Sequence, residues 1–234
     1  MKIALLGYGK MGKTIEKIAL ERGHEIVLKV DNDTDNYDIT QADVAIEFSM
    51  PKSAFANISG CINNGVPVVA GTTGWLADYE KAVSLCKEKN GAFLYASNFS
   101  VGVNVFFAVN KMLAKLMSPH NGYKVAIEEI HHTQKLDAPS GTAITLAEGI
   151  IANSNWESWQ LDGNEANQIP ITAKRIDSVP GTHTISYESE VDTIEIKHTA
   201  HNRNGFALGA VVAAEWILNK KGVFSMNDVL NIAI

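Results

Sequence analysis

The sequence predicts an α/β protein in which a parallel-sheet domain is followed by a second, α+β domain. Short apolar runs separated by helix-length segments fill residues 1–100, the pattern of strands joined by helical crossovers. A glycine-rich turn follows the first of these runs. Beyond residue 180, polar and apolar residues alternate with a period of two, as in antiparallel strands that have one open face.

The first hundred residues predict five strands and three helices. The strands are expected at 2–6, 24–30, 44–48, 66–69 and 92–96, and the helices at 13–22, 53–64 and 76–90. Because strands and helices alternate, we expect a parallel sheet with helices on both faces and right-handed crossovers.

After residue 100 the pattern changes. Helices are expected at 103–117, 142–152 and 206–219, and strands at 124–130, 184–189 and 193–199. The polar segment 154–168 predicts no element. We therefore expect one domain made of residues 1–100 with 204–234 and another made of residues 101–203.

The composition argues against partners that need a strongly charged or apolar surface. The net charge of −6 is spread without long runs, which argues against nucleic acid and anionic membranes but not against small anionic ligands. No apolar run approaches the roughly 20 residues of a membrane span. Cys61 and Cys86 lack CxxC spacing, so buried thiols in a reducing, cytoplasmic compartment are expected.

The glycine-rich turn predicts a dinucleotide site and a first domain of the Rossmann type. Gly7, Gly9 and Gly12 form G-x-G-x-x-G between a strand and a helix. They permit, in turn, a tight turn, the approach of a pyrophosphate and close packing of helix on strand, and the helix N-terminus offers free N–H groups to phosphates. The alternative is a purely structural turn. The residues expected to contact the cofactor are Gly7, Tyr8, Gly9, Lys10, Met11 and Gly12.

Asp31 bears on the choice of cofactor, because it ends the second predicted strand about 20 residues past the glycine turn. A carboxylate here accepts hydrogen bonds from the ribose hydroxyls of NAD and repels the 2′-phosphate of NADP. Asn32 and Asp33 bring no cation, although Lys10 offsets part of the repulsion. We expect NADH to be preferred and NADPH to be usable.

The segment 131–143, HHTQKLDAPSGTA, gathers reactive and turn-forming groups. Pro139 ends the preceding strand pattern, and Ser140 stands where the N-cap of the next helix belongs. The N–H groups of Gly141 and Thr142 are then free to bind an anion such as a carboxylate. The histidines and the lysine of the segment lie on the loop, where they can face a ligand.

Residues 128–143, EEIHHTQKLDAPSGTA, resemble the signature of the dihydrodipicolinate (4-hydroxy-tetrahydrodipicolinate) reductase family of the diaminopimelate route to lysine. The glycine turn, GTTG at 71–74 and ASNFSVGVN at 96–104 also agree with the family, so the resemblance spans nearly the whole chain. The glycine turn is one residue shorter than is common in the family, and Asp31-Asn32 replaces an acidic–basic pair found in members that use both cofactors.

The resemblance implies roles for individual residues. His131 matches a proton donor or acceptor, Lys135 a second catalytic proton donor, and His132 a ligand of a substrate carboxylate. Gly141 and Thr142 match the backbone cradle of a carboxylate. Positions that line the nicotinamide half of the cofactor are matched by Phe48, Gly71, Thr72, Thr73, Ala96, Ser97, Asn98 and Phe99.

The implied reaction is the NAD(P)H-dependent reduction of 4-hydroxy-tetrahydrodipicolinate to tetrahydrodipicolinate with loss of water. A hydride attacks a conjugated cyclic dicarboxylate and a proton is delivered elsewhere on it, for which histidine is a suitable general acid. The resemblance also implies a homotetramer. Residues 1–100 with 204–234 would then form the dinucleotide-binding domain, and residues 101–203 the substrate-binding and oligomerisation domain.

Other hypotheses about the function stay open at this point. No catalytic metal is expected, because His131 and His132 would point to opposite faces of a strand, and His198 and His201 lack clustered acids or cysteines. A non-catalytic NAD-binding sensor would not need His131, Lys135 and the carboxylate cradle together. A reductase of another small carboxylated imine shares the nucleotide motifs, so only the segment 131–142 argues against it.

Overall fold

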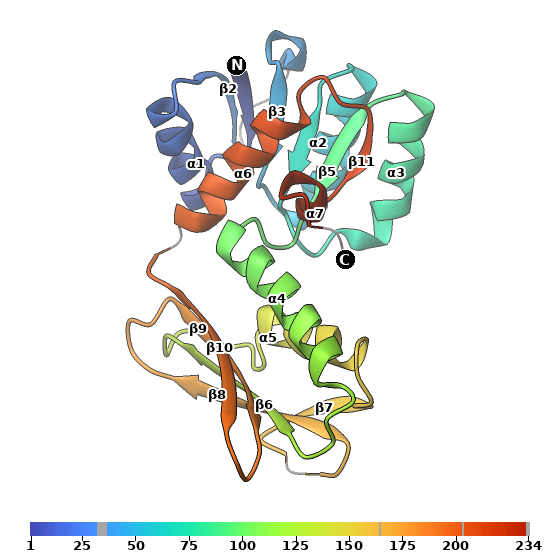
Figure 1. Ribbon diagram of the computed structural model, residues 1–234. Helices are drawn as coiled ribbons and strands as arrows, with labels where there is room; N and C mark the ends of the chain where they lie inside the picture. Colours follow the sequence, from blue (N-terminus) through green and yellow to red (C-terminus); the bar gives the residue numbers. More distant parts are fainter. Residues whose placement is uncertain (32–36, 164, 203, 233–234) are drawn as a thin grey trace. The chain divides into compact units, whose positions relative to one another are not determined.

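The computed structural model describes residues 1–31, 37–163, 165–202 and 204–232 (Figure 1). The chain divides into two compact units, residues 1–101 with 204–233 (unit 1) and residues 102–203 (unit 2). Within the described ranges, no helix combines the length and the apolar character needed to cross a membrane.

Unit 1 is built on a sheet whose neighbouring strands are all parallel within the described residues, which confirms the predicted parallel sheet. In spatial order the strands are β11 (Gly222–Phe224), β5 (Ala92–Tyr95), β4 (Val68–Ala70), β3 (Val44–Glu47), β1 (Lys2–Leu6) and β2 (Glu25–Val30). The helices are α1 (Lys10–Glu21), α2 (Pro51–Asn63), α3 (Tyr79–Glu88), α6 (Asn204–Ile217) and α7 (Met226–Val229).

Both faces of this sheet are buried, which explains why its strands read as continuous apolar runs. Ile3 and Leu5 of β1 join one core with α1 and α6, which pack on each other (Figure 1). Ala4 and Leu6 join a second core with α2 and α3. Successive strand residues point to opposite faces, so a strand covered on both sides is mostly apolar, with Glu47 of β3 as a buried exception.

The strand order reverses beside β1, because β2 lies on one side of it and β3, β4 and β5 on the other. The carboxyl ends of β1 and β3 meet there so closely that a Cβ on Gly7 would lie 2.1 Å from the carbonyl oxygen of Phe48. Open parallel sheets bind their ligands at such a reversal point. The fold thus places the loops after β1 to β5 at the carboxyl-terminal end of the sheet.

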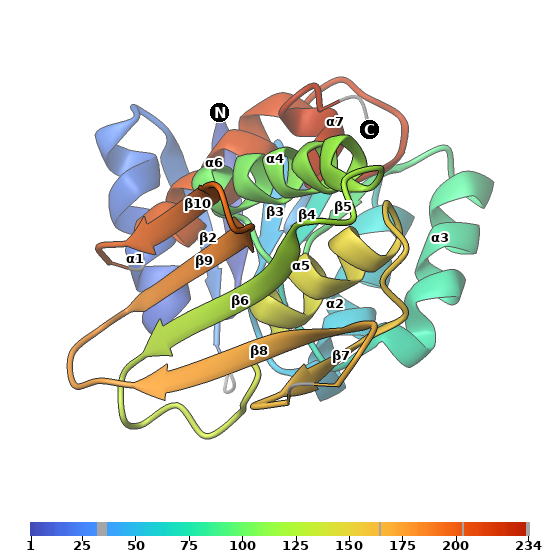
Figure 2. The same ribbon diagram turned by 60° about the horizontal axis from the view of Figure 1, so that its bottom comes forward.

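Unit 2 carries a mixed sheet, in the order β10 (Thr193–Ala200), β9 (Gly181–Glu188), β6 (Lys124–His131), β8 (Gln168–Arg175) and β7 (Ser158–Leu161). β9 is antiparallel to β6 and β10, whereas β6, β8 and β7 run parallel. This confirms the predicted antiparallel pair near the end of the unit. Helices α4 (Val101–Met117) and α5 (Gly141–Ile151) cover one face of the sheet (Figure 2).

The covered face of this sheet changes character along β6. Val125 and Ile127 pack into the core beneath α4 and α5. Glu129 and His131 follow on the same face of β6. Glu129 lies opposite His183 of β9, and His131 lies opposite Arg175 of β8. The strand therefore leads from an apolar core into a charged cluster.

Among the described residues, five elements were not predicted: the 3₁₀ helix η1 (Ile39–Gln41), β7, β8, β11 and α7. β8 contains Pro170, and proline is uncommon inside a strand because it lacks the N–H of the ladder. β11 and α7 are only three and four residues long. Helix α1 begins at Lys10 rather than at residue 13, because Gly9 already serves as its N-cap.

Candidate active site

Each glycine of the nucleotide motif has its own steric reason. Gly7 has a φ of +100° in addition to its contact with the Phe48 carbonyl, and a Cβ on Gly12 would lie 2.3 Å from the carbonyl oxygen of Gly7. Above Gly9 there is open space, since a Cβ there would meet nothing within 4 Å. A tight turn, close packing of the helix and room for a pyrophosphate are the three requirements of a dinucleotide turn.

The start of α1 is suited to an anion. Its N-cap is Gly9, no side chain caps it, and its first turn holds no acidic residue. The N–H groups of Lys10 and Met11 are therefore left for a ligand, at the positive end of the helix dipole. Tyr8 is already engaged, because its hydroxyl donates to Glu16.

The loops after β3, β4 and β5 bring together four of the residues predicted to line the nicotinamide. The Phe48 ring covers Gly71, where a Cβ would lie 2.2 Å from the ring, and stands 5.5 Å from the Phe99 ring between centroids. Thr72 is buried, and its Oγ1 accepts from the Ser49 N–H at 2.8 Å. The loops therefore pack against one another at the carboxyl-terminal end of the sheet.

The other predicted cofactor residues lie at the same end but are less enclosed. Thr73 and Ser97 are exposed, Ala96 is half-buried, and Asn98 Oδ1 accepts from the Ser100 N–H at 2.9 Å. Asp31 is exposed directly after β2, and its contact with the cofactor ribose stays a prediction. Asn32 and Asp33, named in the same argument, lie outside the described residues.

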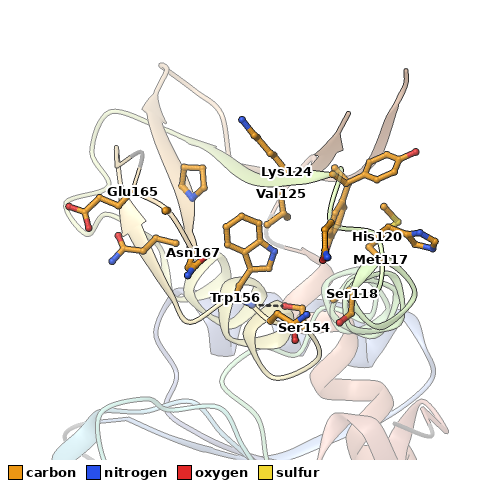
Figure 3. Close-up of a pocket in the computed structure, with 17 residues that line it drawn as sticks. Met117, Ser118, His120, Lys124, Val125, Ser154, Trp156, Glu165 and Asn167 are labelled. Atoms are coloured by element: carbon orange, nitrogen blue, oxygen red, sulfur yellow. Dashed lines mark hydrogen bonds between the residues drawn. The ribbon is translucent and has the colours of Figure 1, made fainter. Parts of the chain in front are cut away.

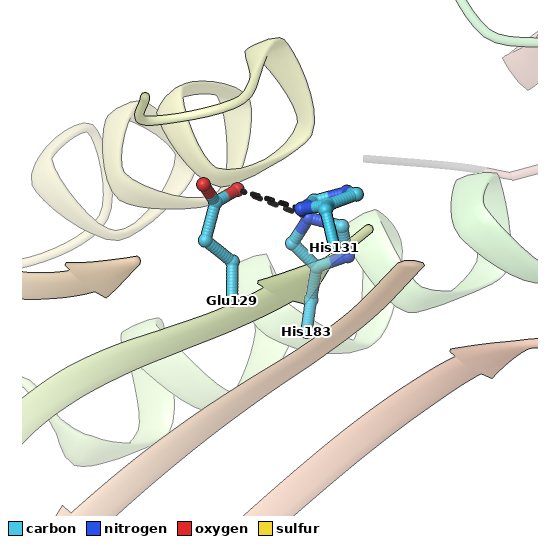
Figure 4. Close-up of side chains that lie close together, drawn as sticks. All are labelled: Glu129, His131 and His183. Carbon is cyan, nitrogen blue, oxygen red and sulfur yellow. Dashed lines mark ion pairs between the residues drawn. The ribbon is translucent and has the colours of Figure 1, made fainter. Parts of the chain in front are cut away.

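In unit 2 a buried carboxylate lies between two buried imidazoles (Figure 4). Glu129 Oε2 lies 3.6 Å from Nδ1 of His131 and 3.6 Å from Nε2 of His183. Glu129 Oε1 lies 3.2 Å from a terminal guanidinium nitrogen of Arg175. The carboxylate is fully buried, so these three side chains and the Ser140 N–H, at 3.0 Å from Oε2, replace its hydration.

The cluster sets the charge states of its members. Burial raises the pKa of Glu129, but its interactions with His183, Ser140 and His131 outweigh burial and bring the pKa down to about 2. Burial lowers the pKa of His131 to about 4; His183, Lys135 and Arg175 add to this, while Glu129 opposes it. At neutral pH, Glu129 is ionised and His131 is neutral.

The start of α5 is tied to this cluster through its N-cap. Ser140 Oγ accepts from the Ala143 N–H at 3.2 Å and lies 3.1 Å from Nε2 of His183. The first intrahelical bond runs from the Ile144 N–H to the Ser140 carbonyl. The helix itself provides no acceptor for the N–H groups of Gly141 and Thr142, and their binding of a carboxylate stays a prediction.

The loop that carries Lys135 is fastened by Arg175. The guanidinium donates to the carbonyl of Lys135 at 3.2 Å and to the carbonyl of Asp137 at 2.7 Å, besides pairing with Glu129. Lys135 Nζ lies 2.8 Å from both carboxylate oxygens of Asp137. His132 is half-buried at the start of this loop.

Sequence reasoning did not find Arg175 or the part played by His183 and Glu129. His183 is buried in the cluster, and no motif in the sequence indicated its part there. Both missed partners reach β6 through strand pairing, from more than 40 residues away in the chain. A prediction of the register between β6, β8 and β9 would have been needed to find them.

A separate cavity of about 610 Å³ opens at the other end of β6, where Trp156 projects into it (Figure 3). Val125 and Tyr187 also line it. Six residues of strand separate Val125 from His131, or about 20 Å at the usual rise. The cavity is therefore distinct from the charged cluster.

The fold and the two groups of residues define a dinucleotide-dependent oxidoreductase. Unit 1 has a parallel sheet with a phosphate-binding turn at the point where the strand order reverses. Unit 2 has buried acid–base groups beside the start of α5, which is capped by Ser140.

Comparison with known proteins gives the family. The family models "Dihydrodipicolinate reductase, N-terminus" and "Dihydrodipicolinate reductase, C-terminus" match residues 1–99 and 102–230. The 4-hydroxy-tetrahydrodipicolinate reductase of Christiangramia forsetii is 59% identical over 99% of this chain and 98% of its own length. That of Neisseria meningitidis serogroup B is 33% identical over 93% and 84%. The chain belongs to the dihydrodipicolinate reductase family.

It is accordingly an NAD(P)H-dependent oxidoreductase of the reduction step in diaminopimelate and lysine biosynthesis. The fold is shared with the dipicolinate-bound dihydrodipicolinate reductase of Paenisporosarcina sp. TG-14. That structure covers 96% of this chain and 97% of its own, with a TM-score of 0.78 and 23% identity.

Proposed function

We propose that this chain reduces 4-hydroxy-tetrahydrodipicolinate at the loop and helix start of residues 131–142, with His131 and Lys135 handling the proton. One observation carries the proposal. The N-cap of α5 and, through Arg175, the loop of Lys135 are held by the buried carboxylate of Glu129, and the imidazole of His131 faces the same carboxylate at 3.6 Å. A single anchor that orders a general acid, a cation and an anion-binding helix end is suited to a small dicarboxylate.

The two substrate carboxylates would be held by groups of different kinds. The N–H groups of Gly141 and Thr142 at the positive end of α5 suit one of them. Lys135 and His132 suit the other. Lys135 Nζ is paired with Asp137, whose side chain is 61% exposed, so a substrate carboxylate can replace that partner at little cost.

His131 would take up its proton together with the substrate. Its pKa of about 4 leaves it neutral at pH 7, and a dianion bound beside it favours the imidazolium form. Nδ1 faces Glu129, which leaves Nε2 as the nitrogen that delivers the proton. Bound NAD(P)H supplies the hydride. The loss of water is part of the overall reaction.

Substitution of the two proton-handling residues tests these roles. His131→Ala should lower kcat by about 10²–10³, the usual contribution of a general acid, and Lys135→Ala should lower kcat and raise KM. His120→Ala, which changes an exposed histidine of the same unit, is the control. Pyridine-2,6-dicarboxylate serves as a trial inhibitor. Near-normal kcat in both variants would refute the assignment.

We also propose that NADH is preferred over NADPH, supported by the exposed carboxylate of Asp31 at the end of β2. The ratio of kcat/KM for the two cofactors tests this directly. A preference for NADPH above tenfold would overturn the part given to Asp31.

A cytoplasmic homotetramer is the assembly that we propose. The open face of the unit 2 sheet supports self-association, because it presents Glu128, Lys174 and Thr184 in neighbouring strands. Light scattering of the protein and of Lys174→Glu tests this surface. A monomer at micromolar concentration would contradict it.

A further inference from the structure

Glu129, His131 and His183 together offer a set of metal-binding atoms, and the reductase reaction does not use them as a metal site. We infer that these three residues form a Zn²⁺-binding site, and that the ion, once bound, holds the enzyme inactive. The binding stands on the geometry of unit 2 alone, whereas the inhibition rests on the proposed role of His131.

The three candidate ligand atoms already converge. Each of the three residues offers one candidate ligand atom within 4.8 Å of the other two, and His131 Nδ1 and His183 Nε2 each lie 3.6 Å from Glu129 Oε2. In a tetrahedral zinc site with bonds of about 2.0–2.1 Å, neighbouring ligand atoms are roughly 3.3 Å apart. The two oxygen–nitrogen distances therefore need to shorten by only a few tenths of an ångström.

A second, independent feature points to a ligand at this place. His131 Nδ1 is buried and has no hydrogen-bond partner among the described residues. A buried polar atom without a partner is costly, and an ion between the two imidazoles would satisfy it. Figure 4 shows both imidazoles directed toward the same carboxylate oxygen.

The surroundings resemble the outer shell of a metal site. Glu129 Oε1 is held by Arg175, whereas Oε2 faces the two imidazoles and also accepts from the Ser140 N–H. The Ser140 N–H donates to the carboxylate, whereas the 3.1 Å contact of Ser140 Oγ with His183 Nε2 is one that a bound ion would replace. Hydrogen-bonded carboxylates of this kind orient metal ligands.

The donor set selects the class of ion. Two imidazole nitrogens and one carboxylate oxygen make up the three-ligand zinc site that keeps a fourth position open. Imidazole also suits Co²⁺ and Ni²⁺, whereas Mg²⁺ and Ca²⁺ prefer sites made of oxygen. All three side chains are buried, so the ion would be poorly accessible to water.

Occupation would remove the general acid. An imidazole bound to zinc through Nδ1 cannot take up a second proton to become imidazolium. Its remaining Nε2–H is far less acidic than an imidazolium N–H, so proton delivery to the substrate stops. We expect Zn²⁺ at saturation to lower kcat by at least about tenfold.

The test uses the full chain, freed of metal with a chelator. Co²⁺ is titrated first, because tetrahedral Co²⁺ shows visible absorption bands, and Zn²⁺ is then used to displace it. Turnover is measured with and without Zn²⁺, and again after the chelator is restored. His183→Gln removes one ligand but can keep the hydrogen bond to Ser140, and His120→Gln is the matched control.

The inference predicts saturable, visible Co²⁺ bands that Zn²⁺ abolishes, and inhibition that the chelator reverses. His183→Gln should weaken binding by at least about tenfold and escape inhibition, while His120→Gln behaves as the unchanged protein does. Absence of Co²⁺ bands, or equal metal binding in both variants, would overturn the site. Binding that depends on His183 but leaves turnover intact would uphold the site and overturn the proton role of His131. If His183→Gln melts early in chelator, the Co²⁺ spectrum of the unchanged protein decides alone.

Discussion

Replacing Glu129 by glutamine removes one buried charge from unit 2 and leaves the side-chain shape nearly unchanged. The fall of the Glu129 pKa from 4.5 to about 2 corresponds to roughly 3 kcal/mol of folding free energy at neutral pH. Because the pKa is lower in the folded state, this stabilisation is present above pH 4.5 and is lost as the pH falls toward 2. Glu129→Gln should therefore be less stable than the unchanged protein by roughly 3 kcal/mol at pH 7.

Urea unfolding followed by tryptophan fluorescence measures this difference; Trp156 and Trp159 report on unit 2, and Trp75 and Trp216 report on unit 1. The difference in the free energy of unfolding between the two proteins should stay constant from pH 7 to about 5 and become smaller below pH 4.5. Glu128→Gln is the matched control, because Glu128 is the preceding residue of β6 and its ion pair with Lys174 is partly exposed; it should cost less than about 1 kcal/mol. A loss below 1 kcal/mol for Glu129→Gln, or a difference that does not depend on pH, would refute the reasoning.

Three further predictions follow from the described contacts. Gly7→Ala should cost several kcal/mol and raise the KM for NADH, because its Cβ would lie 2.1 Å from the Phe48 carbonyl oxygen; Gly23→Ala, at a φ of +81° but in open space, should cost only about 1–2 kcal/mol in thermal unfolding. Ser140→Ala should cost about 1 kcal/mol through the lost cap and should raise the KM for the dicarboxylate more than it lowers kcat, in steady-state assays. Burial lowers the pKa of His131 from 6.5 to about 4, so unfolding titrations should show stability lost as the pH falls from 6.5 to 4, and His131→Gln should lack this loss.

The parallel sheet of unit 1 could be predicted because each of its main strands is a local signal. The runs that became β1 and β3 are apolar apart from Lys2 and Glu47, and the glycines between β1 and α1 carry steric requirements that the structure shows one by one. β8 carries no such signal. Its inner half is apolar, but Pro170 and a polar outer half conceal the strand.

The candidate site shows the same division. His131, Lys135 and the helix start at Ser140 belong to one continuous segment, so the sequence alone predicts that they belong to one site. Arg175 and His183 join them only because β8 and β9 flank β6 in a particular register. Register depends on packing against α4 and α5, which no local pattern encodes.

The order in which the chain is made has a consequence for how unit 1 is completed. Unit 2 is continuous, whereas unit 1 has to wait for α6 and β11, which follow residue 203. Until then Leu5, Leu94 and their neighbours lack the α6 residues Ala210 and Ala214 that close their core. At 5–20 residues per second, the gap between β5 and the end of α6 takes on the order of ten seconds to synthesise. During that interval the newly made sheet exposes an apolar face on the ribosome, which is the stage at which this chain would depend on a chaperone.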